Sequence, residues 1–157
     1  MEPRNLQTVL AQQPLLRDLE PRHLALLTGC ARNVRFDRGA YLAREGQGAE
    51  TFYLIRSGRV AVELHQPGSP PLTIQTVGPG EFFGWSWLVP PHRWRFDGRA
   101  VEPAGTIQFD ATCLRAKCEE DHELGYQVLR RLIQMVAGRL EGARLQLLDL
   151  YALETRR

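Results

Sequence analysis

The chain has 157 residues, a length that suits a single domain with a sizeable core. Its 20 basic and 18 acidic residues nearly balance, which argues against nucleic-acid or membrane binding through bulk charge. The N-terminus has no signal-peptide pattern and no apolar run approaches the ~20 residues of a membrane span, so we expect a cytoplasmic protein with no membrane partner.

The first part of the chain, residues 6–33, is predicted to form helices. Apolar residues recur at helical spacing from Leu6 until Pro14 interrupts them. A second helix is expected to start near Pro21, because a proline in the first helical turn loses no hydrogen bond. Gly29 is typical of a helix end.

From residue 34 to residue 109 the hydrophobic period changes to two, which predicts strands. Residues 51–55 are rich in β-branched and aromatic side chains, and residues 59–64 alternate apolar and polar. Glycine-rich turns separate such segments at roughly 8–12-residue spacing, which indicates a sandwich or a barrel. We therefore expect a mainly β fold with flanking helices.

The C-terminal part, residues 110–153, is predicted to be helical. Asp110 is expected to cap a short helix through Leu114, and Asp121 to open a long one. In the long helix, apolar residues are spaced alternately three and four apart for more than three heptads, which is the pattern of a coiled-coil seam. The seam consists of Tyr126, Leu129, Ile133, Val136, Leu140, Ala143, Leu147 and Leu150.

Two interpretations of this seam remain open. It pairs with the same helix of a second chain, or it packs on the core of its own chain. We favour a homodimer, because the seam continues beyond what a small β domain covers. Gly138 and Gly142 each cost about 1 kcal/mol of helix propensity, which indicates close approach of another backbone or a ligand. Four leucines off the seam are candidates for packing on the β domain: Leu124, Leu132, Leu145 and Leu148.

Residues 80–99 form a segment that we call the cassette. Turn glycines lead into it, and three tryptophans within ten residues are then followed by a cluster of arginines. A flexible backbone beside concentrated positive charge suggests a loop that receives an anion.

A series of turn motifs runs through the chain in a fixed order, and together with the long C-terminal helix it resembles the cyclic-nucleotide-binding domain of the catabolite activator protein (Crp/Fnr-like) superfamily. The resemblance covers about residues 14–151. The motifs are Phe36-Asp37-Arg38-Gly39-Ala40-Tyr41-Leu42, Glu45-Gly46, Phe52-Tyr53-Leu54-Ile55, Ser57-Gly58-Arg59-Val60, Gly78-Pro79-Gly80-Glu81-Phe82-Phe83-Gly84 and Arg99-Ala100-Val101-Glu102-Pro103.

The resemblance implies a double-stranded β-helix, also called a β-roll or jelly roll, in a single domain over residues 1–157. Activator-type relatives carry a helix-turn-helix module after the long helix, but only about six residues follow Tyr151 here, so we expect a stand-alone form without that module. A small anionic ligand, cAMP or cGMP, would lie between the roll and the long helix. In such proteins the cassette forms a short helix whose backbone amides, with one arginine, receive the cyclic phosphate.

Three positions depart from the family pattern. Trp85 stands where the family usually has a glutamate that accepts a hydrogen bond from the ribose, and an indole offers only a donor. Arg93 and Arg95 flank Trp94, which falls at the phosphate-binding arginine position, and neither register supplies the hydroxyl residue that normally follows. At residues 143–144 the hydroxyl groups expected to reach the base are replaced by Ala and Arg.

Three outcomes for the ligand site therefore stay open: a cyclic nucleotide, a different flat or anionic ligand, or aromatic side chains that fill the vacated pocket in a domain that binds a protein partner. The candidate ligand-binding residues are Phe83, Gly84, Trp85, Ser86, Arg93, Trp94, Arg95, Arg99, Ala143 and Arg144.

An enzyme and a transcription factor are the rival interpretations. The four histidines are far apart in sequence, no HxH, GxSxG, Walker or HExxH motif is present, and we predict no catalytic or metal site. Cys30, Cys113 and Cys118 form no CxxC pair, so we expect reduced thiols. Only about six residues follow Tyr151, too few for a recognition helix, and direct DNA binding is not expected. We therefore predict a non-enzymatic regulatory or sensor module.

Overall fold

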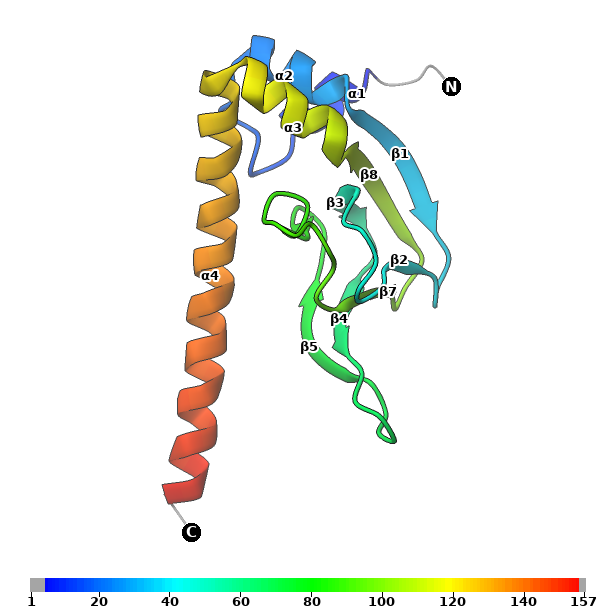
Figure 1. The fold of residues 1–157 in the computed structure, drawn as a ribbon, viewed down its shortest axis with the longest axis vertical. Coiled ribbons are helices and arrows are strands. Elements are labelled where there is room, and N and C mark those ends of the chain that lie inside the picture. Colours follow the sequence, from blue (N-terminus) through cyan, green and yellow to red (C-terminus); the bar gives the residue numbers. More distant parts are fainter. Residues whose placement is uncertain (1–4, 156–157) are drawn as a thin grey trace.

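The computed structural model describes residues 5–155 and shows a β sandwich with three helices gathered at one end and a long fourth helix along one side (Figure 1). Two antiparallel four-stranded sheets form the sandwich, in the orders β1-β8-β3-β6 and β2-β7-β4-β5. The mainly β fold class with flanking helices is confirmed. The strands are β1 (Ala31–Phe36), β2 (Tyr41–Ala43), β3 (Thr51–Ser57), β4 (Val60–Leu64), β5 (Leu72–Val77), β6 (Phe82–Phe83), β7 (Asp97–Ala100) and β8 (Ala104–Asp110). The helices are α1 (Leu6–Ala11), α2 (Pro21–Thr28), α3 (Ala111–Glu120) and α4 (His122–Thr155).

Two element boundaries differ from the predicted ones, and long-range pairing fixes the first. Strand β1 starts at Ala31 rather than residue 34, since it pairs with β8 along its whole length, from Ala31 opposite Phe109 to Phe36 opposite Ala104. Helix α3 continues to Glu120, well past the expected end near residue 114.

Aspartates cap both C-terminal helices, as predicted. The Asp110 side chain accepts a hydrogen bond from the Cys113 N–H at 2.8 Å, and the Asp121 side chain accepts one from the Leu124 N–H at 3.2 Å. The Leu124 N–H and then the Arg22 guanidinium hold the pKa of Asp121 below its usual range.

An aromatic stack joins the cassette to the core. Phe52 of β3 stacks on Trp87 and on Phe109, with ring centroids 4.4 Å and 4.6 Å away and interplanar angles of 8° and 11°. Trp87 has no exposed surface, so the middle of the cassette is anchored inside the sandwich.

A disulfide joins Cys30, two residues after the end of α2, to Cys113 in the first turn of α3. The two Cα atoms are 5.7 Å apart although 83 residues separate them in sequence. The prediction of three reduced thiols is therefore wrong, and Cys118 alone is free among the cysteines.

Helix α4 packs on the rest of the chain only through its first part. Leu124 and Leu132 are buried there, as predicted for these two off-seam leucines. Every residue from Leu140 to Thr155 is exposed, and the C-terminal half stands apart from the sheets (Figure 1). Leu145 and Leu148 are 55% and 62% exposed, so the expectation that they pack on the β domain is wrong.

The long apolar seam of α4 does not pack on its own core. Leu129, Ile133, Leu147 and Leu150 are each more than half exposed. Among residues 5–155 the structure holds no helix that is long and apolar enough to cross a membrane.

Candidate ligand-binding cavity

A cavity of about 1040 Å³ lies between the sandwich and α4. Its walls come from β4 and β5, the turn before β6, the start and end of the cassette, and α4 between Gln134 and Gln146. Most side chains on these walls are apolar, among them Val62, Ile74 and Phe83. A space of this size, with few polar groups, is typical of a small-molecule site.

Four of the predicted ligand residues line this cavity: Phe83, Gly84, Trp85 and Ala143. Trp85 forms an edge-on aromatic pair with Phe96, whose ring centroid is 5.7 Å away. The two rings therefore give the cavity an aromatic wall on the cassette side.

The cassette does not form the short helix that the resemblance implied. Between Gly84 and β7 the chain makes turns, bends and one isolated β-bridge, of Arg93 with Gly48. In one of the turns the Leu88 N–H donates to the Trp85 carbonyl at 3.0 Å. Pro90 and Pro91 lack the N–H groups that a continuing helix needs. The cavity therefore has no helix N-terminus at this position to receive a phosphate.

Trp94 and Ser86 lie in the interior rather than on the cavity wall. The Trp94 ring covers Gly84, where a Cβ atom would come within 2.5 Å of it, and its centroid is 5.4 Å from that of Phe83. Both Trp94 and Ser86 are buried. Trp94 thus packs against the Gly84 turn, although its position in the sequence is the one where the family pattern has the phosphate-binding arginine.

The predicted cassette arginines also lie off the cavity wall. Arg93 donates to the Gly46 carbonyl at 2.8 Å, and Arg95 is exposed. Arg99 forms a forked ion pair with Glu63, with N–O distances of 2.9 Å and 3.0 Å. Hydrogen bonding from Arg99 also holds the pKa of Glu63 below its usual range. The forked geometry ties Arg99 to β4, away from the cavity.

On α4, Arg144 is exposed and lies off the cavity wall, whereas Arg139 is part of it. Arg139 donates to the Phe82 carbonyl, and its Cζ atom lies 5.9 Å from the centroid of the Trp85 ring. Arg139 is not among the residues predicted from the sequence to bind a ligand. A signal was present, because Arg139 precedes Ala143 by one helical turn and therefore shares its face.

Gly138 and Gly142 face open space at the cavity. A Cβ atom at either position would meet nothing within 4 Å, and both residues line the cavity. The close approach that these glycines predict is therefore not made within the described part of this chain, and it stays a prediction for a ligand or a second chain.

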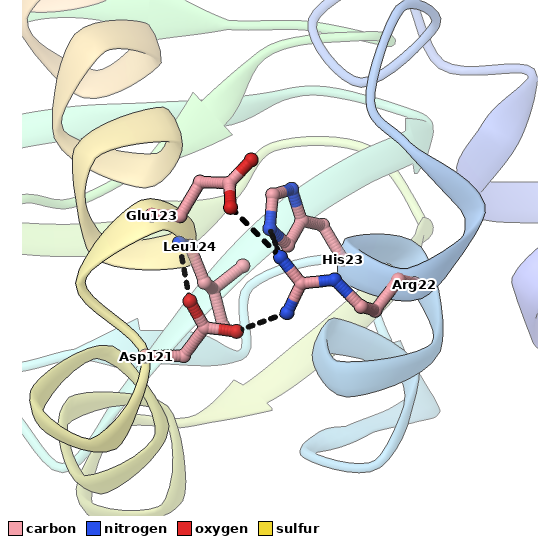
Figure 2. A network of polar contacts seen from close by, with 5 residues as sticks. All are labelled: Arg22, His23, Asp121, Glu123 and Leu124. Atoms are coloured by element: carbon pink, nitrogen blue, oxygen red, sulfur yellow. Dashed lines mark hydrogen bonds and ion pairs between the residues drawn. The ribbon is translucent and has the colours of Figure 1, made fainter.

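One group of side chains in residues 5–155 has the spacing of metal ligands. Glu20, His23 and Glu123 each offer one ligand atom within 4.8 Å of the others. Figure 2 shows the Arg22 guanidinium between His23 and Glu123. It lies 2.9 Å from His23 Nε2 and donates to Glu123 at 3.0 Å and to Asp121 at 2.5 Å. Since this cation already contacts His23 and Glu123, we describe the cluster as an ion-pair network that ties α2 to the start of α4.

Comparison with known proteins identifies the fold family. The family model of the cyclic nucleotide-binding domain matches residues 33–121, more than half of the chain. The chain belongs to the cyclic nucleotide-binding domain family. This family is one of binding domains, and the recognition of a Crp/Fnr-like domain from the turn motifs is confirmed.

Curated members of the family share parts of this sequence. The domain is 26% identical over 145 residues to the CRP-like cAMP-activated global transcriptional regulator of Mycobacterium tuberculosis, which covers 92% of this chain and 63% of that protein. It is 33% identical over 76 residues to human cGMP-dependent protein kinase 2, which covers 48% of this chain and 10% of the kinase. The chain thus spans less than two thirds of the length of these relatives.

Solved structures of the cyclic nucleotide-binding family share the architecture. A cyclic nucleotide-binding domain from Methylobacillus flagellatus superposes with a TM-score of 0.77 at 21% identity, covering 92% of this chain and 82% of that one. The catabolite activator protein of Thermus thermophilus superposes with a TM-score of 0.69 at 26% identity, covering 90% and 64%.

Proposed function

We propose that this cyclic nucleotide-binding domain is a non-enzymatic regulatory module that binds a small anionic molecule between the sandwich and α4 and acts as a homodimer through the α4 seam. The observation that carries the proposal is that the cavity and the seam share residues. Val136, Leu140 and Ala143 are seam positions and also line the cavity. A ligand in the cavity therefore touches the surface that a second chain would cover.

The shared residues supply a mechanism for regulation. A ligand shifts an equilibrium only if it has different affinities for the two states. A molecule that contacts both the sandwich and α4 restricts the angle at which the helix leaves the domain, and that angle sets how two seams meet. Ligand binding and dimer affinity are then linked by one coupling free energy, typically about 1–3 kcal/mol.

The cassette of this domain has diverged from the family pattern. Trp85 replaces the hydrogen-bond acceptor expected after Gly84, and the cassette arginines have partners or lie exposed away from the cavity. The relatives named above are a cAMP-activated regulator and a cGMP-dependent kinase. These two cyclic nucleotides are therefore the first ligands to test.

A second candidate function is binding of a protein partner without any small molecule. The burial of Trp94 over Gly84 favours it, because the ring occupies the turn that the family pattern leaves for the ligand. The exposed α4 seam would then be the partner-binding surface.

Titration with cAMP and cGMP, followed by tryptophan fluorescence, separates these candidates. Trp85 lines the cavity beside Arg139, so an occupant of the cavity should change its emission. Unchanged fluorescence together with a flat calorimetric titration to millimolar ligand would remove the cyclic-nucleotide version. A dimer dissociation constant that is the same with and without a bound ligand would remove the regulatory coupling.

A further inference from the structure

Arg139 is a desolvated cation without a carboxylate partner. No carboxylate in residues 5–155 lies within ion-pair distance of its guanidinium, whose hydrogen bond goes to the Phe82 carbonyl. Removal from water lowers the pKa of Arg139 from its usual value, and the charge of nearby Glu81 opposes this only in part. An arginine stays protonated under such conditions, so it remains a charge that an anion would stabilise.

Arg139 is also the only basic residue among the described residues that line the cavity. The wall around it is mostly aromatic and aliphatic. The centroid of the Trp85 ring lies 5.9 Å from the guanidinium carbon, and Phe96 packs edge-on against Trp85 on the same wall. Val62, Ile74 and Leu140 add apolar surface. Glu81 also lines the cavity, but it is exposed and accepts a hydrogen bond from the Gly78 N–H at 3.4 Å. A single cation in mostly apolar surroundings suits a ligand that is mostly apolar and carries one anionic group.

A cyclic nucleotide fits these walls poorly. Its ribose hydroxyl would find the Trp85 indole, which offers no acceptor, and its cyclic phosphate would find neither a helix N-terminus nor an arginine in the cassette. Buried polar groups without partners reduce affinity strongly. An aromatic ring beside Trp85 and Phe96 needs no such partners.

We propose that the cavity takes a flat, largely apolar molecule with a single carboxylate, and that Arg139 of α4, rather than the cassette, recognises the anionic group. This inference rests on the proposed function in one respect only, namely that the cavity is a ligand site. It places charge recognition on the helix that carries the seam, so the anionic group of the ligand forms its ion pair directly with α4.

The test compares naphthalene-2-carboxylate with naphthalene-2-carboxamide, two probes that share a ring system and differ in charge. We expect calorimetry to show that the wild-type protein binds the carboxylate about 10- to 100-fold more tightly than the carboxamide, the range expected for hydrogen bonds to a charged group. Arg139→Gln should abolish this preference by weakening the binding of the carboxylate probe and leaving the binding of the carboxamide unchanged. Arg144→Gln is the matched control: this arginine is on the same helix but off the cavity wall, and its loss should leave the preference unchanged.

Several results would overturn the inference. They are equal affinities of the wild-type protein for the two probes, no carboxylate binding up to millimolar concentration, or a preference that survives Arg139→Gln. The comparison of the two probes uses the wild-type protein, so it tests the inference even if the Arg139→Gln variant misfolds. Tighter binding of cAMP or cGMP than of naphthalene-2-carboxylate would reject this ligand class while leaving the proposed regulatory function intact.

Discussion

At the scale of single residues, two cassette positions decide where the aromatic side chains lie. Gly84 has φ +95° and lies under the Trp94 ring, so this turn needs a residue without a Cβ atom. With Trp94 over Gly84 and Trp87 in the core, Trp85 is the tryptophan left for the cavity. The sequence predicted an aromatic site here. It could not show which of the three tryptophans lines the cavity, because that depends on how each ring packs in the folded core.

Gly84→Ala should therefore destabilise the domain through two effects. A left-handed backbone costs a residue with a Cβ atom about 1–2 kcal/mol, and the contact with Trp94 adds about 1–3 kcal/mol of overpacking. Gly46→Ala is the matched control, because Gly46 has φ +85° but open space around it. Urea unfolding should show a clearly larger loss for Gly84→Ala, and equal losses would contradict the role of Trp94.

Cys118 is expected to be an unreactive thiol near neutral pH. Burial, helped by the charges of Glu119 and Asp121, raises its pKa to about 11. Because the thiolate is the reactive form, the rate of alkylation by iodoacetamide should rise about tenfold per pH unit from pH 8 to pH 10 in the folded protein. A rate that levels off near pH 8.5 would show that the thiol has an ordinary pKa.

At the scale of elements, local patterns predicted the helices and strands well, and contacts between distant elements were missed. The heptad spacing predicted α4, and the aspartate caps predicted the starts of α3 and α4. The disulfide could not be predicted, because only the pairing of β1 with β8 brings Cys30 beside the first turn of α3. Arg139 was missed for a similar reason, since its environment is created by β6 and the cassette.

Removal of the disulfide should loosen the junction of α2 with α3. Closing a loop between positions 83 residues apart restricts the unfolded chain, and the loss of such a bond typically costs about 2–4 kcal/mol. Cys30→Ser combined with Cys113→Ser should therefore lower the free energy of unfolding by this amount. A reductant should lower that of the wild-type protein equally and leave the double variant unchanged.

The cysteine count provides an independent check of this bond. Alkylation of the unfolded, unreduced protein should modify Cys118 alone, and alkylation after reduction should modify all three cysteines. Three modified cysteines without a reductant would show that the bond is absent in solution, and the stability loss would then have another cause.

At the scale of the whole molecule, the central feature is a helix that is much longer than the domain on which it packs. The 34 residues of α4 begin on the sandwich and end in an exposed apolar face. Sequence periodicity revealed both the helix and its seam. It did not reveal that the cavity lies against the same face of α4. How far each cassette side chain enters the interior depends on how the folded core packs.

Substitutions on the exposed half of α4 distinguish the seam from ordinary helix surface. Leu147→Asp places a charge on the seam, and Leu148→Asp places the same charge one position off it. Both leucines are more than half exposed in the single chain, at 55% and 62%, so neither change should impair folding. Leu147→Asp should dissociate the proposed dimer, measured by light scattering, and Leu148→Asp should not. If both variants behave alike, the heptad seam is not the contact surface.

The mass of the wild-type protein in solution tests the central claim most directly. Sedimentation velocity over a wide concentration range should show a species with twice the 17.9 kDa mass of the chain, dissociating on dilution. A mass of 17.9 kDa at every concentration, including the highest attainable, would contradict pairing through α4 and with it the proposed link between the cavity and the dimer.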